Sequence, residues 1–219
     1  MNKCAEGPDE ISSLVIGTEA KQVLVLDPPG NSIRVKCTLP SVPVFMGITG
    51  LFDVEYRIVV ACRDGALYTI KNGEVTSTVI ELQSHPVGLA RIQKSILIGT
   101  MENTIFCYHI KGTKNYSLYM PCRITNMEVL RTRKTRMVNC LLVALENGEV
   151  RCYNGKSLVA TLNTKSRITA MRFGAYGREE NSFIYLNSDG ALTIKMLRRT
   201  AKLESAGAKP GPPPEQDVP

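Results

Sequence analysis

The 219-residue sequence has a formal net charge of +7, 43% hydrophobic residues and a mean hydropathy of −0.05. This balance is typical of a globular chain and excludes an intrinsically disordered one. No apolar run reaches membrane-spanning length and residues 1–10 lack a signal-peptide core, so we expect an intracellular chain. The charge permits an acidic partner, nucleic acid or an anionic membrane surface, but requires none of them.

In chain order, residues 1–11 predict a flexible N-terminus, and the first apolar run begins in SSLVIG at residue 12. A pattern of a small or apolar residue, polar residues, a turn and a new β run then recurs. Its copies are GTEAKQVLVL (17–26), ACRDGALYTI (61–70), GTMENTIFCY (99–108), ALENGEVRCY (144–153) and LNSDGALTI (186–194). The fifth position holds Gly or Asn in four copies, as a turn with positive φ would require; the residues are Lys21, Gly65, Asn103, Gly148 and Gly190.

The fourth copy lies in LVALENGEVRCYNG (142–155), which contains two Asn-Gly pairs, at 147–148 and 154–155. Asn-Gly between apolar runs favours a two-residue type I′ turn, in which both central residues have positive φ. The stretch therefore predicts strand, turn, strand, turn. Such short strands need neighbouring sheets to bury their apolar side chains.

A further β run follows most of these hairpins and another precedes all but the first, so each unit contains four short strands. Four-stranded units at intervals of roughly forty to fifty residues indicate an all-β β-propeller, in which neighbouring blades cover each other's faces. We therefore predict a partial propeller over residues 12–197. Its expected blades are 13–38, 43–83, 86–120, 123–162 and 167–196.

The predicted strands begin with the second strand of one blade and end with the third strand of another. They therefore form an incomplete propeller of about four and a half blades. A half-open ring would expose a blade face and unpaired strand edges. We therefore expect a fragment or incomplete product that lacks N-terminal blades. The alternative is a five-bladed ring closed by pairing the two partial blades.

Two segments are more polar than the blades. Residues 198–219 are rich in Pro and Gly and predict a linker, with a docking site for a proline-binding domain as the alternative. The basic cluster RTRKTR (131–136) predicts a solvated loop, and a phosphate-binding patch is the alternative.

No catalytic, cofactor or metal site stands out. The seven cysteines form no C-x-x-C pair and mostly occupy strand-like segments, where a free thiol acts as a small apolar group. Only His85 and His109 are available, so we expect neither a zinc site nor a nucleophile with a histidine partner. Acidic residues such as Asp64 and Asp189 lie in or beside turns, where they are expected on structural grounds. We therefore predict no cofactor, no direct small-molecule ligand and no enzyme activity.

An ordered set of short sequences carries a family resemblance: LPSVPVF (39–45), FDVEYR (52–57), PVGL (86–89), NGEVR (147–151) and FGAYGREEN (173–181), then LRRTA (197–201) and GPPP (211–214). Their order resembles the Bardet–Biedl syndrome protein 1 family, subunits of the ciliary coat complex called the BBSome. The resemblance runs from about Ser12 to Pro214. It implies that the chain corresponds to the later blades of a seven-bladed N-terminal propeller and the start of the linker that follows.

The resemblance also implies a function. We expect a non-enzymatic scaffold that works with other BBSome subunits in cilium assembly and in the transport of membrane-protein cargo to and from cilia. Recruitment to membrane would occur through a GTP-bound ARF-like small GTPase, which the family contacts with its first and last propeller blades. The expected locations are the cytoplasm, the cilium, the basal body or centrosome and the ciliary membrane surface.

Only the last-blade half of that contact could lie in this chain. The candidate partner-binding residues are Arg178, Glu179, Lys195, Arg198 and Arg199. In FGAYGREEN, Gly174 and Gly177 would shape a tight loop that presents Arg178 and Glu179. Two structural alternatives remain, a local Arg178–Glu179 ion pair and a solvated linker for the basic residues. An alternative function is a propeller module that binds nucleic acid or another acidic partner; nucleic acid is disfavoured because aromatic stacking platforms are missing.

Overall fold

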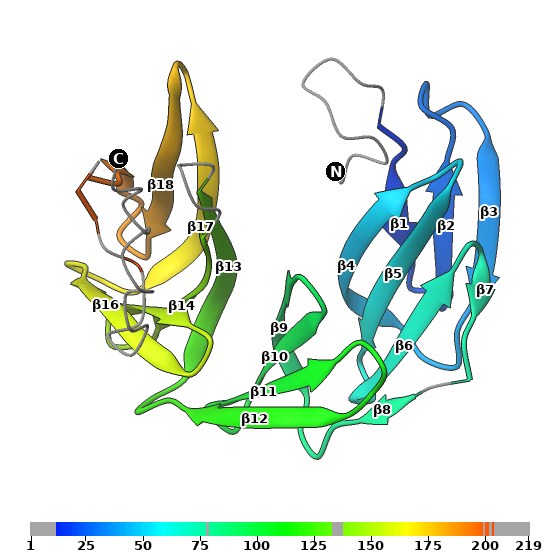
Figure 1. Ribbon diagram of the computed structural model, residues 1–219, viewed down its shortest axis with the longest axis horizontal. Helices are drawn as coiled ribbons and strands as arrows, with labels where there is room; N and C mark the ends of the chain where they lie inside the picture. Colours follow the sequence, from blue (N-terminus) through cyan, green and yellow to red (C-terminus); the bar gives the residue numbers. More distant parts are fainter. Residues whose placement is uncertain (1–11, 78, 133–137, 199, 202, 204–219) are drawn as a thin grey trace, which may run out of the picture. The chain divides into compact units, whose positions relative to one another are not determined.

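Antiparallel hairpins make up the whole described fold, as the turn pattern predicts (Figure 1). The computed structural model describes residues 12–77, 79–132, 138–198, 200–201 and 203. Contacts divide the chain into two compact units, the first ending at Met127 and the second beginning at Glu128. No helix among the described residues is long and apolar enough to cross a membrane.

Nineteen strands are assigned to the described residues, in five antiparallel sheets. The first sheet contains β1 (Val15–Gly17), β2 (Gln22–Leu26) and β3 (Ile33–Thr38). The second contains β4 (Pro43–Leu51), β5 (Glu55–Cys62), β6 (Ala66–Lys71), β7 (Glu74–Val75) and β8 (Ile80–Glu81). The third contains β9 (Pro86–Ile92), β10 (Ser95–Thr100), β11 (Thr104–His109) and β12 (Lys114–Tyr119).

The fourth sheet contains β13 (Ile124–Thr132), β14 (Val138–Leu145), β15 (Glu149–Asn154) and β16 (Ser157–Asn163). The fifth contains β17 (Ile168–Tyr176), β18 (Glu179–Asn187) and β19 (Leu192–Met196). Strands follow each other in sequence order within every sheet, apart from β8, which pairs with β6 beside β7. This up-and-down order is the connectivity expected of propeller blades.

The recurring turn is confirmed at all five positions. Each fifth residue has positive φ, from +57° to +88°, and its N–H donates to the carbonyl oxygen three residues earlier; the residues are Lys21, Gly65, Asn103, Gly148 and Gly190. Lys21 adopts this conformation although it lacks the freedom of glycine, so the blade geometry outweighs the local preference of the side chain.

The predicted type I′ turns at 147–148 and 154–155 are wrong in detail. In each pair only the glycine has positive φ. At the first pair, the amide Oδ1 of Asn147 accepts the N–H of Glu149 at 3.0 Å, a local bond typical of asparagine in turns. Both central residues have positive φ at Asn72-Gly73 instead, between β6 and β7.

That tight turn has a consequence for the second sheet. It returns the chain at once to β6, where Lys71 pairs with Glu74 and Ile70 with Val75. The chain rejoins β6 only at Ile80, opposite Leu67. The single outer strand expected here is therefore split into β7 and β8.

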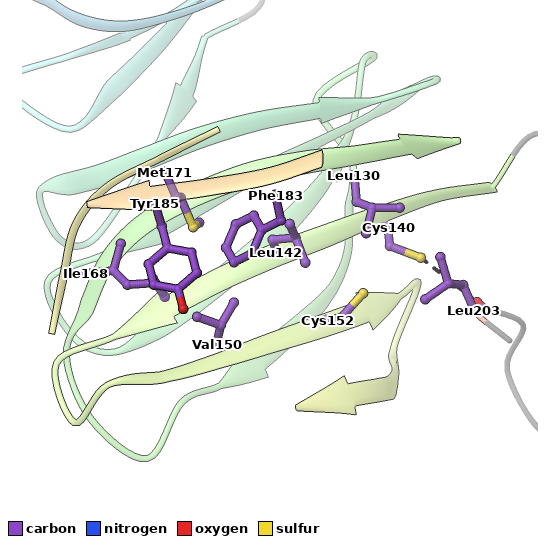
Figure 2. Packing of buried hydrophobic residues seen from close by; sticks show 11 residues of the cluster. Leu130, Cys140, Leu142, Val150, Cys152, Ile168, Met171, Phe183, Tyr185 and Leu203 are labelled. Carbon is purple, nitrogen blue, oxygen red and sulfur yellow. Dashed lines mark hydrogen bonds between the residues drawn. The ribbon is translucent and has the colours of Figure 1, made fainter. Parts of the chain in front are cut away.

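The apolar cores lie between neighbouring sheets. In the first unit, one cluster joins the first and second sheets through residues such as Val23, Ile58 and Ile70. Another joins the second and third sheets through Val59, Ala61 and Ile98. In the second unit, Figure 2 shows Phe183 and Tyr185 of β18 pointing toward Leu142 and Val150 of the fourth sheet.

Candidate partner-binding surface

The turn between β17 and β18 presents two of the predicted residues. Gly177 has φ +60°, and the Cα register pairs Tyr176 with Glu179 across the turn. Arg178 and Glu179 are both exposed. Gly174 lies inside β17, opposite Ser182, so the expectation that two glycines shape the loop holds only for Gly177.

A local ion pair was the structural alternative for this turn. Within the described part of the chain, no ion pair joins Arg178 to Glu179. Their charged groups face solvent at the end of the sheet. An exposed pair would add little stability in any case, so both side chains can contact a partner at small cost to the fold.

Register places Arg198 at the same end of the fifth sheet. Ser182 pairs with Met196, and the N–H of Leu197 donates to the carbonyl oxygen of Asn181 at 2.9 Å. Residue 198 therefore follows the end of β19 beside the start of β18, which carries Glu179. Lys195 lies in β19 next to Met196 and opposite Phe183, and both Lys195 and Arg198 are exposed. Arg199 lies outside the described residues.

An apolar cavity of about 710 Å³ adjoins this basic end of β19. Lys195 and Arg198 contribute to its lining, whereas Arg178 and Glu179 do not. Val150, Cys152 and Leu162 line it from the fourth sheet, and Phe173 and Phe183 from the fifth. The structure thus joins a charged edge to an apolar hollow, the combination of polar rim and apolar centre found in protein interfaces.

Leu203 also lines this cavity, although it falls in the segment predicted as linker. It is 8% exposed and belongs to the core cluster of the second unit (Figure 2). Its carbonyl oxygen accepts the side-chain N–H of Asn154 at 2.9 Å and the thiol of Cys140 at 4.0 Å. The packed structure therefore extends at least to Leu203. The only sequence signal was one apolar residue in a polar stretch.

Cys152, which lines this cavity, has a second thiol, that of Cys140, as its neighbour. Cys140 and Cys152 are buried on the neighbouring strands β14 and β15. The hydrogen bond with Cys140, together with burial, raises the pKa of the Cys152 thiol. A protonated, buried thiol packs as a small apolar group and is a poor nucleophile.

The basic cluster and the possible metal ligands considered from the sequence add no residues to this surface among those that the structure describes. Of the basic cluster 131–136, Arg131 is exposed at the end of β13, while Arg133, Lys134 and Arg136 lie outside the described residues. In the described ranges, no group of three or more His, Cys, Asp or Glu side chains could hold a metal ion.

Comparison with known proteins identifies the relationship. The family "Ciliary BBSome complex subunit 1" matches residues 1–71. The human BBSome complex member BBS1 is 41% identical over 209 residues, which is 95% of this chain and 35% of the human protein. The mouse protein is 40% identical over 206 residues, with 94% and 35% coverage. The chain is thus similar to BBS1 over almost all of its own length. It spans about a third of the length of these curated relatives.

Solved structures agree with the sequence match. BBS1N in a complex with ARL6DN, from a lead-soaked crystal, gives a TM-score of 0.89 at 44% identity, covering 92% of this chain and 62% of that one. A mercury-soaked crystal of the same complex gives 0.87, covering 89% and 64%. BamB from Moraxella catarrhalis gives 0.60 at 16% identity, covering 85% and 55%, a likeness of fold alone. These neighbours are β-propellers, so the predicted all-β propeller class is confirmed, as is the resemblance to BBS1.

Proposed function

We propose that this chain is a non-enzymatic propeller module of a BBSome coat, and that it takes part in recruitment by an ARF-like small GTPase. One observation carries the proposal: the chain is 44% identical to BBS1N, a propeller solved in a complex with ARL6DN, with a TM-score of 0.89. Fold similarity alone would not support a function, but identity at this level over most of the chain does.

The geometry of the fifth sheet supports a contact there. Arg178, Glu179 and Arg198 are exposed at one end of that sheet, and Lys195 is exposed along its last strand. Exposed charges of this kind contribute more to association rate and partner choice than to affinity. We propose that they form the rim of the GTPase contact, while the cavity beside Lys195 and Arg198 supplies its apolar centre.

In the cell, this module would act with other BBSome subunits. The coat would transport membrane-protein cargo to and from cilia and support cilium assembly. We propose that the protein resides in the cytoplasm and concentrates at the basal body or centrosome, in the cilium and on the ciliary membrane surface. The relatives' names as BBSome complex members support this assignment.

The direct test is capture of the purified chain on immobilised ARL6 locked in its GTP-bound or GDP-bound state. We expect capture by the GTP-bound state and little by the GDP-bound state. Arg178→Glu should weaken capture about fivefold or more, because it reverses a rim charge. Lys165→Glu is the matched control, since Lys165 is exposed in the same unit but precedes β17, at the opposite end of the fifth sheet.

Two results separate the parts of the proposal. If neither nucleotide state captures the chain, its role in recruitment is overturned. If the GTP-bound state captures wild type, Arg178→Glu and Lys165→Glu equally well, recruitment stands and the placement of the contact at Arg178 is wrong.

A further inference from the structure

A basic cavity of about 440 Å³ lies in the first unit, remote in sequence from the candidate partner-binding surface. Three hairpins line it with their turns or the adjoining strand ends: β4–β5, β9–β10 and β11–β12. The charged or titratable side chains that line it are Glu55, Arg57, Arg91, Lys94, His109 and Lys111. Four permanent cations thus share the lining with one carboxylate.

That carboxylate is already paired. Oε1 of Glu55 lies 2.9 Å from Nη2 of Arg57 and 3.8 Å from Nζ of Lys71. Glu55 therefore offsets the charge of Arg57 more than that of the other cations. Arg91, Lys94 and Lys111 dominate the electrostatic potential of the rest of the cavity, which is positive.

Backbone contacts fix the local geometry of these hairpins. The N–H of Ile110 donates to the carbonyl oxygen of Lys94 at 2.9 Å, which joins the β11–β12 turn to the β9–β10 turn. Gly50 has φ +93°, and a side chain there would overlap the carbonyl oxygen of Glu55. The N–H of Lys111 donates to Nδ1 of His109 at 3.2 Å, which leaves Nε2 as the N–H donor of the neutral ring.

Arg91 is the least solvated cation of the cavity. Its Nε and Nη1 atoms are buried, although the cavity beside them is open enough to contain solvent. Burial lowers the pKa of the Arg91 guanidinium, and the nearby charge of Arg57 lowers it further. A partly buried guanidinium crowded by like charge favours an anion beside it.

We propose that this cavity binds a phosphate group carrying more than one negative charge. Guanidinium and ammonium groups from three hairpins, Arg57, Arg91, Lys94 and Lys111, can donate to several phosphate oxygens at once. A single carboxylate has too few oxygens to accept from all of them. The proposal is independent of the GTPase contact, because the two sites lie in different units. No direct small-molecule ligand was expected from the sequence. The cations of this cavity are dispersed along the chain, and the fold brings them together.

The experiment measures binding of two probes to the 219-residue chain. Inorganic pyrophosphate represents a free phosphate compound, and its binding is measured by titration calorimetry. Vesicles of phosphatidylcholine with phosphatidylinositol bisphosphate represent a lipid headgroup, and vesicles of phosphatidylcholine alone are their blank. The test variant is Lys94→Gln with Lys111→Gln, because both side chains are exposed and can be changed without disturbing the core. The control is Lys36→Gln with Lys165→Gln, which removes the same charge from exposed positions elsewhere.

We expect saturable binding of one probe or both, weakened about tenfold or more in the test variant and unchanged in the control. Pyrophosphate binding would identify a free phosphate compound, and binding to charged vesicles alone would identify a headgroup. The proposal is overturned if neither probe binds, or if the control loses as much affinity as the test variant. Arg91→Gln, checked for a native circular dichroism spectrum, should weaken the same probe; normal binding by that variant would also overturn the proposal.

Discussion

The second and fifth sheets show how differently two blades of one chain can be buried. In the second sheet, β5 is buried continuously from Ile58 to Cys62. One face, with Ile58 and Val60, packs against the first sheet, and the other, with Val59 and Ala61, packs against the third. In the fifth sheet, Phe183 and Tyr185 are buried on one face, while Leu192 and Met196 on the other are 66% and 65% exposed.

The difference follows from what covers each face. A strand that packs between two sheets has an unbroken apolar run, as IVVAC (58–62) does. A strand covered on one side should alternate, and LTIKM (192–196) retains apolar residues on the face that the described structure leaves exposed. Large contiguous apolar patches on soluble proteins are commonly interaction sites. If burial sets stability, substitutions in the second sheet should lower the free energy of unfolding more than matched substitutions in the fifth.

The largest loss of stability should come from a substitution in the second sheet. Ile58 is 0% exposed, so Ile58→Ala removes buried methyl groups and leaves a cavity, which should lower the free energy of unfolding by about 3 kcal/mol. Ile194→Ala is the matched control on the fifth sheet, where the side chain is 38% exposed; it should cost about 1 kcal/mol or less. Urea unfolding followed by circular dichroism measures both. Equal losses would contradict the contrast between the sheets.

Substitution of a turn glycine should likewise destabilise the second sheet more than the fifth. Gly50 and Gly190 both have positive φ, but only at Gly50 would a Cβ overlap neighbouring backbone. Gly50→Ala should therefore cost about 3 kcal/mol and Gly190→Ala about 1 kcal/mol, because the second change adds only conformational strain. Thermal unfolding of both variants gives the comparison. A harmless Gly50→Ala would show that the β4–β5 turn can relax.

The features that sequence predicted are those set by local chemistry. Gly65, Asn103 and Gly148 marked the repeated turn, and each of them has positive φ in the structure. What escaped prediction depends on contacts between distant residues. Leu203 is buried because it packs in the core cluster of the second unit, where its carbonyl oxygen also accepts from Asn154, and no periodicity signals this. The basic cavity was missed for the same reason, since its cations come from three separate hairpins.

A smaller loss of stability should follow from removing the hydrogen bond between Asn154 and Leu203. Asn154→Ala removes the 2.9 Å hydrogen bond to the carbonyl oxygen of Leu203, at an expected cost of about 1 kcal/mol. Amide hydrogen exchange should rise at residues 200–203 more than in β18. Asn163→Ala, at an exposed position at the end of β16, is the control and should change neither quantity. Unchanged exchange in Asn154→Ala would mean that the apolar contacts of Leu203 alone hold the segment.

The smallest effect on stability should come from the exposed face of the fifth sheet. Leu192→Ser with Met196→Ser removes two side chains that already contact water, so the free energy of unfolding should change by only about 0.5 kcal/mol. If that face associates with a second copy or a partner, the same variant should reduce association, which sedimentation velocity measures over a range of concentrations. A loss of stability as large as that of Ile58→Ala would show that the face is covered in solution. The second and fifth sheets would then be buried alike, and exposure within one chain would no longer distinguish them.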